Sequence, residues 1–177
     1  MQDDGQARFA ASVLPHLDAA YNLARWLVRD AHDAQDVVQD ALVRALRHFD
    51  GFRGGDPRPW LLAIVRNAAF AWLGARRPGE VEVPDDELDA ALAAGVSPCD
   101  PESLAIRRAE RREIDAAIAG LPIAFREAVV LRELEELSYR DIARITGVPV
   151  GTVMSRLSRG RHLLAAALRP DATRNLA

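Results

Sequence analysis

A proline-bounded acidic segment is the feature that most constrains how this chain can fold. Residues 78–106 carry eight acidic side chains and no basic one. Prolines and mutually repelling charges favour an extended tether over a packed element. We therefore predict a flexible acidic linker over residues 78–101, which separates a first domain (1–77) from a second domain (102–170) and a short tail (171–177).

Helical periodicity runs through both halves of the chain. Apolar residues recur at steps of three and four, and no stretch alternates between apolar and polar residues as a strand would. Pro15 marks the start of the first helix or a bend in it, and Asp30 or Asp33 is suited to cap the next. The predicted fold class is all-α: two small helical domains with helices over 7–29, 30–49, 60–77, 102–119 and 121–136, then a helix-turn-helix.

Residues 137–164 have the pattern of that helix-turn-helix. Ser138 can cap a short helix, Gly147 to Pro149 can end it, and Gly151 opens a longer second helix. The predicted buried stripe of the second helix recurs at steps of four, three and four and consists of Val153, Leu157, Gly160 and Leu164. An ordinary amphipathic helix pair with a solvated basic face is the alternative.

The second helix of this motif has a face suited to DNA. From Arg144 to Arg169, both included, there are five arginines and no acid, although the whole chain has a net charge of −3. Hydroxyl and guanidinium groups at helical spacing suit phosphates and base edges in a major groove. The side chains that form this face are Thr152, Ser155, Arg156 and Arg159. We predict that this helix reads DNA.

The helix over 30–49 has an acidic outer face and an apolar inner face. The predicted outer residues are Asp33, Asp36, Gln39, Asp40, Arg44 and Arg47, and the predicted core residues are Val38, Ala41, Leu42, Ala45, Leu46 and Phe49. Three interpretations are open: a solvated helix start favoured by the helix dipole, a metal site, or a docking surface for a basic partner helix. The metal site has little support, because His16 and His32 have no further His and Asp ligands in a matching pattern.

The segment from Phe49 to Pro59 is predicted to be a loop, since glycines and prolines punctuate it. It mixes aromatic side chains with arginines, a combination that can stack on unpaired bases and hold their phosphates. A plain connector with Phe49 and Phe52 packed into the core fits the sequence equally well. From Arg53 to Arg77 there are five arginines and one acid, so this region is a second basic patch.

Composition excludes several other classes of protein. The lone cysteine, Cys99, allows no internal disulfide and no metal-ligand cluster, so no metal or other cofactor is expected. The apolar runs are too short to span a membrane, and residues 1–12 lack the basic start and apolar core of a secretory signal. We therefore expect a cytoplasmic protein with no membrane insertion.

Three blocks of this sequence together resemble the extracytoplasmic-function sigma factors, the minimal two-domain sigma subunits of bacterial RNA polymerase. Residues 33–41 resemble the polymerase-docking helix of that family, and residues 60–67 resemble its promoter-melting helix. The third block covers Leu121-Pro122, Arg126-Glu127 and the helix-turn-helix. The blocks follow the order of the family, with the linker between them, and span nearly the whole chain.

This resemblance implies a role for each patch. Core RNA polymerase would be bound by Asp33, Asp36, Gln39, Asp40 and Arg44. The opened strand of the −10 promoter element would be held by Phe52, Arg53, Arg58, Arg66, Asn67, Arg76 and Arg77. Duplex −35 DNA would be read by Thr152, Ser155, Arg156, Ser158, Arg159 and Arg161. It also implies that the chain has no catalytic activity and no small-molecule substrate, and that an anti-sigma factor holds it inactive.

Two positions depart from the pattern of many family members. Ala71 stands where an acidic residue is common, and Met154 stands where a basic residue is common. The second departure removes one phosphate or base contact, so the promoter sequence cannot be inferred from relatives. Two rival functions fit parts of the sequence: an autonomous helix-turn-helix regulator acting as a dimer, which leaves residues 30–77 unexplained, and a metal-dependent phosphohydrolase.

Overall fold

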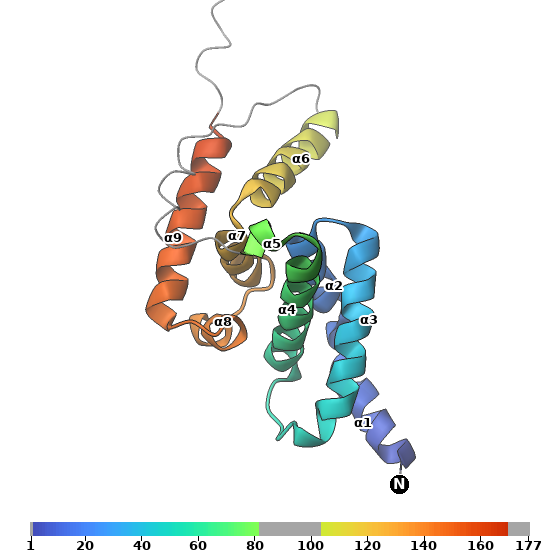
Figure 1. The fold of residues 1–177 in the computed structure, drawn as a ribbon. Coiled ribbons are helices and arrows are strands. Elements are labelled where there is room, and N and C mark those ends of the chain that lie inside the picture. The colour runs from blue at the N-terminus through green and yellow to red at the C-terminus, as the bar shows by residue number, and fades with distance from the viewer. Residues whose placement is uncertain (1, 82–103, 170–177) are drawn as a thin grey trace, which may run out of the picture.

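The computed structural model describes residues 2–81 and 104–169, and within these ranges every regular element is a helix or a helical turn (Figure 1). The all-α prediction is confirmed. Most of the predicted linker, with Cys99, and the whole of the predicted tail (171–177) lie outside the described residues. Over the described ranges, no helix has both the length and the apolar character needed to cross a membrane.

The first domain is built on three packed helices, α2 (Leu17–Val28), α3 (Ala31–His48) and α4 (Pro57–Arg76). The Asp30 carboxylate caps α3 by accepting from the backbone N–H groups of His32 and Asp33, at 2.8 and 3.0 Å. These hydrogen bonds lower the pKa of Asp30. The core combines large leucines with small alanines that allow close helix approach, namely Leu23, Leu27, Leu61, Leu62, Leu73, Ala20, Ala24, Ala34, Ala41, Ala45 and Ala69.

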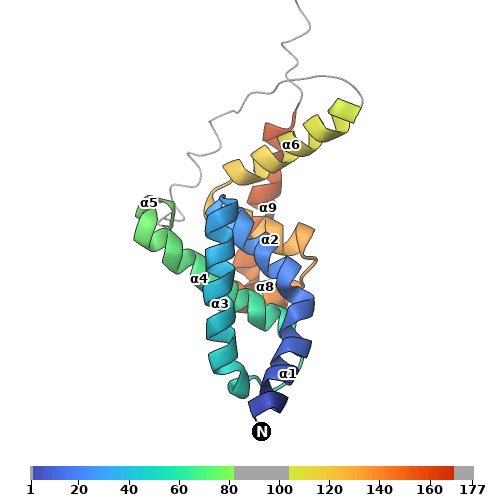
Figure 2. The same ribbon diagram turned by 90° about the vertical axis from the view of Figure 1, so that its right-hand side faces the viewer.

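Short elements flank this three-helix unit. α1 (Gln2–Val13) ends in a 3₁₀ turn, η1 (Leu14–His16), so the helix is interrupted at Pro15 as predicted. A second 3₁₀ turn, η2 (Phe49–Gly51), follows α3 and leads into the loop before α4. α5 (Pro78–Val81) packs against α4 (Figure 2).

The second domain contains the predicted helix-turn-helix. Its elements are α6 (Leu104–Gly120), α7 (Ile123–Val129), the π-helical turn η5 (Val130–Leu134), α8 (Tyr139–Thr146) and α9 (Val150–Ala167). The Ser138 hydroxyl accepts from the backbone N–H of Asp141 at 3.1 Å and caps α8, as predicted. Gly147 ends α8 at a φ of 72°, a left-handed conformation that glycine adopts without strain.

The predicted buried stripe of α9 is confirmed at Val153, Leu157 and Gly160, while Leu164 is half-buried. Gly160 permits close contact with α7, since a Cβ there would lie 2.8 Å from Val129 Cγ2 and 3.5 Å from Phe125 Cβ. Real Cβ atoms essentially never approach a neighbour so closely. Glycine at this position therefore sets the spacing of the two helices.

The two domains pack directly on one another. α8 lies against α4, and α2 lies against both α7 and η5, so helices far apart in the sequence lie side by side (Figure 1). The sequence predicted a tether but no contact between the domains. One core prediction in the first domain is wrong: Leu46 is 47% exposed, because the buried stripe of α3 runs through Ala34, Val37, Val38, Ala41 and Ala45 instead.

Candidate functional site

The predicted docking face on α3 is exposed. Asp36, Gln39 and Asp40 are open to solvent, and Asp33 is half-buried in the first turn. Arg44 pairs with Asp40 one turn earlier at 2.6 Å. Val43 and Leu46 are also exposed, at 48% and 47%, and were not assigned to this face from the sequence. The face is therefore acidic with an apolar flank, which suits a partner helix that carries both basic and apolar residues.

Four aromatic rings, from α1, η2, the loop that follows η2, and α4, form one cluster. Phe49 is buried and contacts Phe9 edge-on, with ring centroids 5.3 Å apart. Phe52 stacks on Phe49 at 6.0 Å and lies 5.0 Å from Trp60. In this conformation Phe52 is half-buried in the cluster, while the neighbouring Arg53 is exposed. The loop therefore exposes the Arg53 side chain to solvent, and the Phe52 ring next to it packs into the aromatic cluster.

The basic patch on α4 divides into two groups. Asn67 and Arg76 are exposed, and the guanidinium groups of Arg76 and Arg77 lie over the Trp72 ring at 4.7 and 5.8 Å. Arg58 and Arg66 instead reach across to the second domain. Arg58 Nη2 lies 2.5 Å from Glu135 Oε2, and Arg66 Nε lies 2.5 Å from Glu127 Oε1.

The acids that receive these arginines are buried. Glu127, on α7, is 1% exposed, and Glu135 is 5% exposed. Burial raises the pKa of the Glu127 carboxyl, against the opposing influence of Arg66 and Arg156. Its second oxygen, Oε2, has no hydrogen-bond partner among the described residues. Glu135 also accepts from Asn22 Nδ2 of α2 at 2.5 Å.

Arg126 adds a fourth polar contact between the domains. Its Nη1 donates to the backbone carbonyl of Trp26 at 3.1 Å. Together with the Arg58, Arg66 and Asn22 contacts, this bond joins α2 and α4 to α7 and the turn that follows η5. We call these four contacts the interdomain clasp. Sequence reasoning missed it, because it paired the basic patches with DNA and assigned Glu127 and Glu135 no role.

The predicted reading face of α9 is largely accessible. Ser155, Ser158, Arg159 and Arg161 are exposed, and Thr152 and Arg156 are half-buried. The Ser155 hydroxyl donates to the Thr152 carbonyl at 3.0 Å, and Arg161 pairs with Glu133 of η5 at 2.5 Å. Arg156 lies within electrostatic reach of Glu127, and its Nε is buried without a hydrogen-bond partner in the described part of the chain. Arg159 is therefore the arginine of this face most open to DNA, and Arg156 faces the domain interior in part.

Two exposed apolar side chains accompany this face. Met154 is 53% exposed and Val150, one turn earlier, is 38% exposed. They lie at the N-terminal end of α9, the part of a recognition helix that contacts base edges in helix-turn-helix proteins. This end of the helix therefore exposes apolar surface beside the polar side chains of the predicted reading face.

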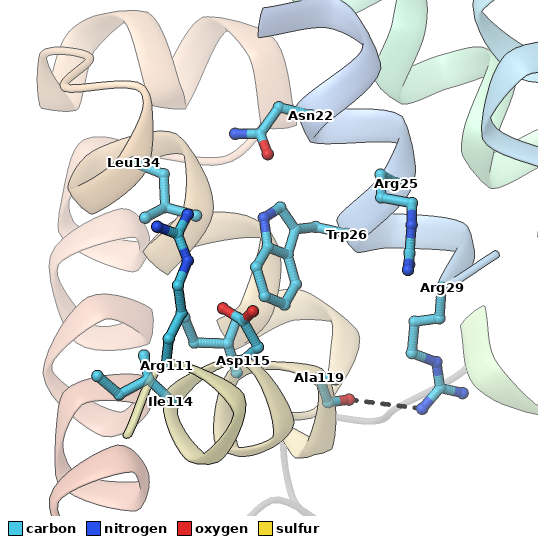
Figure 3. A pocket seen from close by; sticks show the side chains of 10 residues that line it. Asn22, Arg25, Trp26, Arg29, Arg111, Ile114, Asp115, Ala119 and Leu134 are labelled. Atoms are coloured by element: carbon cyan, nitrogen blue, oxygen red, sulfur yellow. Dashed lines mark hydrogen bonds between the residues drawn. The ribbon is translucent and has the colours of Figure 1, made fainter. Parts of the chain in front are cut away.

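A groove of about 1010 Å³ opens between the domains, beside the clasp (Figure 3). Trp26 lies at its centre, with arginines from both domains around it, and Arg29 Nη1 donates to the Ala119 carbonyl at 3.4 Å (Figure 3). Its lining residues are Asn22, Arg25, Trp26, Arg29, Arg111, Ile114, Asp115, Ile118, Ala119 and Leu134.

Among the described residues, no group of three or more His, Cys, Asp or Glu side chains is arranged to hold a metal ion.

Comparison with known proteins gives matches to both domains. The family model "Sigma-70 region 2" matches residues 13–77, and "Sigma-70, region 4" matches residues 111–164. The RNA polymerase sigma-H factor of Pseudomonas aeruginosa is 36% identical to this chain, over 96% of the chain and 91% of the relative. The ECF RNA polymerase sigma-E factor of Escherichia coli K12 is 38% identical, over 78% and 75% respectively.

Two solved structures share the fold. The sigma factor RpoE of Bartonella quintana, in complex with the anti-sigma factor NepR, matches with a TM-score of 0.69 and 28% identity over 93% of this chain and 98% of that chain. CnrH, in complex with the cytosolic domain of CnrY, matches with a TM-score of 0.63 and 26% identity over 91% and 87%. Both matches span the two domains.

Proposed function

Because the chain belongs to the extracytoplasmic-function sigma factors, we propose that its two domains divide the work of promoter recognition. Such a factor is the promoter-specificity subunit of bacterial RNA polymerase, which binds the core enzyme, recognises the −35 and −10 elements and helps to melt DNA. The observation that carries this function is the pair of sigma-70 matches, region 2 before region 4, in a chain that aligns with a sigma relative over 96% of its length.

The α3 face is the proposed contact with core polymerase. Its exposed residues Asp36, Gln39 and Asp40 carry negative charge and hydrogen-bonding groups, and Val43 and Leu46 add apolar area beside them. A basic helix of the polymerase with matching apolar residues complements such a face. Val43 and Leu46 therefore extend the docking site beyond the acids that the sequence indicated.

The first domain is proposed to bind the opened −10 strand. The phosphates of that strand can pair with Arg53, Arg58, Arg66, Arg76 and Arg77. The aromatic cluster around Phe52 offers rings on which an unstacked base can stack. Extruding one base costs a few kcal/mol, which stacking and charge-assisted hydrogen bonds can offset. Helix α9 of the second domain is the proposed reader of the −35 duplex, and Arg159 is one of its exposed cations.

Tethering explains why two weak DNA contacts suffice. Each domain offers only a few phosphate contacts, and its affinity alone falls steeply with salt. When both domains are held on polymerase, the second DNA contact becomes effectively intramolecular. Binding and positioning of DNA in this way require no catalytic group in the chain. Because its proposed partner is RNA polymerase, the proposed site of action is the cytoplasm.

Core-dependent promoter binding is the test of this function. The full chain should be retained on immobilised core polymerase, and the resulting holoenzyme should start transcription from a promoter fragment of the source genome. Tight promoter binding without polymerase, together with no affinity for the core, would support an autonomous regulator instead. That rival leaves the region 2 match unexplained.

An anti-sigma factor is the proposed regulatory partner, since one of the matched sigma factors was solved with such a protein. The interdomain groove supports this proposal, because Arg25, Arg29 and Arg111 surround the apolar side chains of Trp26 and Ile114. A helix with one acidic and one apolar face complements it. Ile114→Glu should abolish binding of a co-expressed anti-sigma factor while core binding persists.

A further inference from the structure

We propose that Trp72 is a positioning residue for promoter DNA: its indole face holds the guanidinium groups of Arg76 and Arg77 in the orientation in which they meet phosphates. This inference rests on the proposed function, since both arginines are proposed contacts of the −10 strand. It adds a residue that need not touch DNA itself and yet sets how tightly the first domain binds that strand.

The position of Trp72 on its helix is the first support. It lies near the C-terminal end of α4, which reaches the edge of the molecule beside α5 (Figure 2). Arg76 follows one helical turn later, and helical side chains lean toward the N-terminus of their helix, so Arg76 falls over the ring. The guanidinium carbons of Arg76 and Arg77 lie 4.7 and 5.8 Å from the ring centroid. Both lie within the range at which an aromatic face attracts a cation.

The difference in burial between the ring and the cation is the second support. Trp72 is half-buried and packs against the core, so its neighbours fix its position. Arg76 is exposed, and within the described ranges no carboxylate forms an ion pair with it. Contact with a fixed ring restricts the rotamers of this long side chain before DNA arrives. Less conformational entropy is then lost when Arg76 binds a phosphate.

Arg66, on the same helix, shows that a guanidinium lying over a ring can still bind an anion. Its guanidinium carbon is 4.0 Å from the centroid of the Phe70 ring, and its Nε is 2.5 Å from Glu127 Oε1. The N–H donors of a guanidinium lie in its plane, whereas the ring contacts its face. Carboxylates and phosphates accept from the same donors. Arg76 over Trp72 can therefore bind a phosphate as Arg66 binds a carboxylate.

The indole N–H of Trp72 takes no part in this arrangement. Its nitrogen, Nε1, is buried and has no hydrogen-bond partner among the residues that the structure describes. Trp72→Phe therefore keeps an aromatic face, breaks no hydrogen bond and removes one unsatisfied donor. Trp72→Leu keeps apolar bulk but has no aromatic face. These two substitutions separate the contribution of the ring face from that of the bulk.

The test is a double-mutant cycle between Trp72 and Arg76, in holoenzyme formed with the full-length chain. Affinity for a fluorescent promoter fragment is measured for the wild type, Trp72→Leu, Arg76→Ala and the double variant. Trp72→Leu should weaken binding by about two- to fivefold for each guanidinium that the ring holds, the range of one exposed cation–π contact. Arg76→Ala should weaken binding severalfold when Trp72 is present and much less when leucine replaces it. An equal effect of Arg76→Ala in both backgrounds, zero included, would overturn the proposal.

Salt dependence distinguishes a positioned cation from a general loss of structure. Each phosphate contact with a single strand contributes about 0.7 to the slope of log affinity against log salt concentration. Trp72→Leu should make this slope shallower, and Trp72→Phe should restore most of both the slope and the affinity. If phenylalanine binds as weakly as leucine, or if the slope does not change, the ring face does not position the arginines.

Tyr21→Leu is the matched control. It replaces an aromatic ring with leucine at a half-buried position of α2, and no contact with DNA or polymerase is proposed for Tyr21. Its promoter affinity and salt slope should equal those of the wild type. A loss as large as that of Trp72→Leu would show that removing any ring from this domain weakens DNA binding, and would overturn the proposal.

Arg76→Lys provides a second route if Trp72→Leu does not fold. Lysine keeps the charge at this exposed position but lacks the planar guanidinium that lies over the ring. A severalfold loss of promoter affinity supports the positioned guanidinium, and affinity equal to that of the wild type overturns it. Wild-type holoenzyme on the same fragment separates the two levels. If it does not bind the promoter, the proposed function fails; if it binds while the Trp72 and Arg76 variants behave as the wild type, only the positioning role fails.

Discussion

Arg66 and Glu127 are joined across the two domains, with Arg66 Nε 2.5 Å from Glu127 Oε1 although 61 positions separate them in the sequence. The Arg66 guanidinium also lies 4.0 Å from the centroid of the Phe70 ring on its own helix. A cation placed between a carboxylate and an aromatic face is held from both sides. Arg66 is thus a structural link between the two domains as well as a proposed contact for the opened −10 strand.

Glu127 should make stability depend on pH. Burial raises the pKa of this carboxyl above its usual 4.5, so the folded chain binds the proton more tightly than the unfolded chain does. Its contribution to stability is complete below pH 4.5 and is lost as pH rises through the folded-state pKa. The melting temperature of the wild type, relative to that of Glu127→Gln, should therefore fall as pH rises above 4.5. A difference that does not vary with pH would contradict the raised pKa.

Asp36→Arg should remove core polymerase binding. It reverses the charge at the centre of the exposed α3 face, where a basic partner is expected. Asp18→Arg makes the same charge change at an exposed position of another helix, α2, and should bind as the wild type does. Affinity is measured by fluorescence anisotropy with labelled core enzyme. Equal affinity of the two variants would place the docking site elsewhere.

Local features of this fold could be predicted from the sequence. The Ser138 cap, the left-handed Gly147 and the buried Val153 stripe depend on residues within a few positions of each other. The width of a buried stripe is harder to predict. Leu46 continues the apolar pattern of α3, but small alanines at positions 34, 41 and 45 let the neighbouring helices pack there and leave Leu46 at the edge.

Contacts between the domains could not be predicted in the same way. Glu127 and Glu135 fall within an ordinary helical pattern, and nothing near them in sequence indicates that Arg66 and Arg58 are their partners. A basic face considered by itself is most simply interpreted as a nucleic-acid contact, so the sequence predicts DNA as the partner of these arginines. The same arginines serve a second set of contacts that only the folded arrangement reveals.

Arg159→Ala and Arg156→Ala should differ in their effects. Arg159 is exposed, so its loss should weaken binding of a −35 duplex by about 1–3 kcal/mol if it contacts a base, and leave the melting temperature unchanged. Arg156 is half-buried beside Glu127, so its loss should also lower the melting temperature. Binding is measured with holoenzyme and unfolding by circular dichroism. A matching drop in melting temperature for both would contradict this division.

Met154 should contact the methyl group of a thymine in the −35 element. It is 53% exposed near the N-terminal end of α9, the end that we propose contacts DNA, and apolar side chains read thymine through its 5-methyl group. Deoxyuridine differs from thymidine only by lacking that methyl. Replacing thymines one at a time should weaken wild-type holoenzyme at one position, and Met154→Ala should lose most of that discrimination. If the deoxyuridine scan is flat for the wild type, Met154 does not read a methyl group.

Gly160→Ala should destabilise the second domain by about 1–3 kcal/mol, the usual cost of overpacking a core. The added Cβ would lie 2.8 Å from Val129 Cγ2, and both side chains sit in a helix contact with little room to move. Gly151→Ala is the control on the same helix, since nothing lies within 4 Å of its added Cβ. Alanine also has the higher helix propensity, so this control should match or exceed the wild type in thermal stability. Equal stability of the two variants would mean that α7 and α9 can separate without cost, and that glycine is not what sets their spacing.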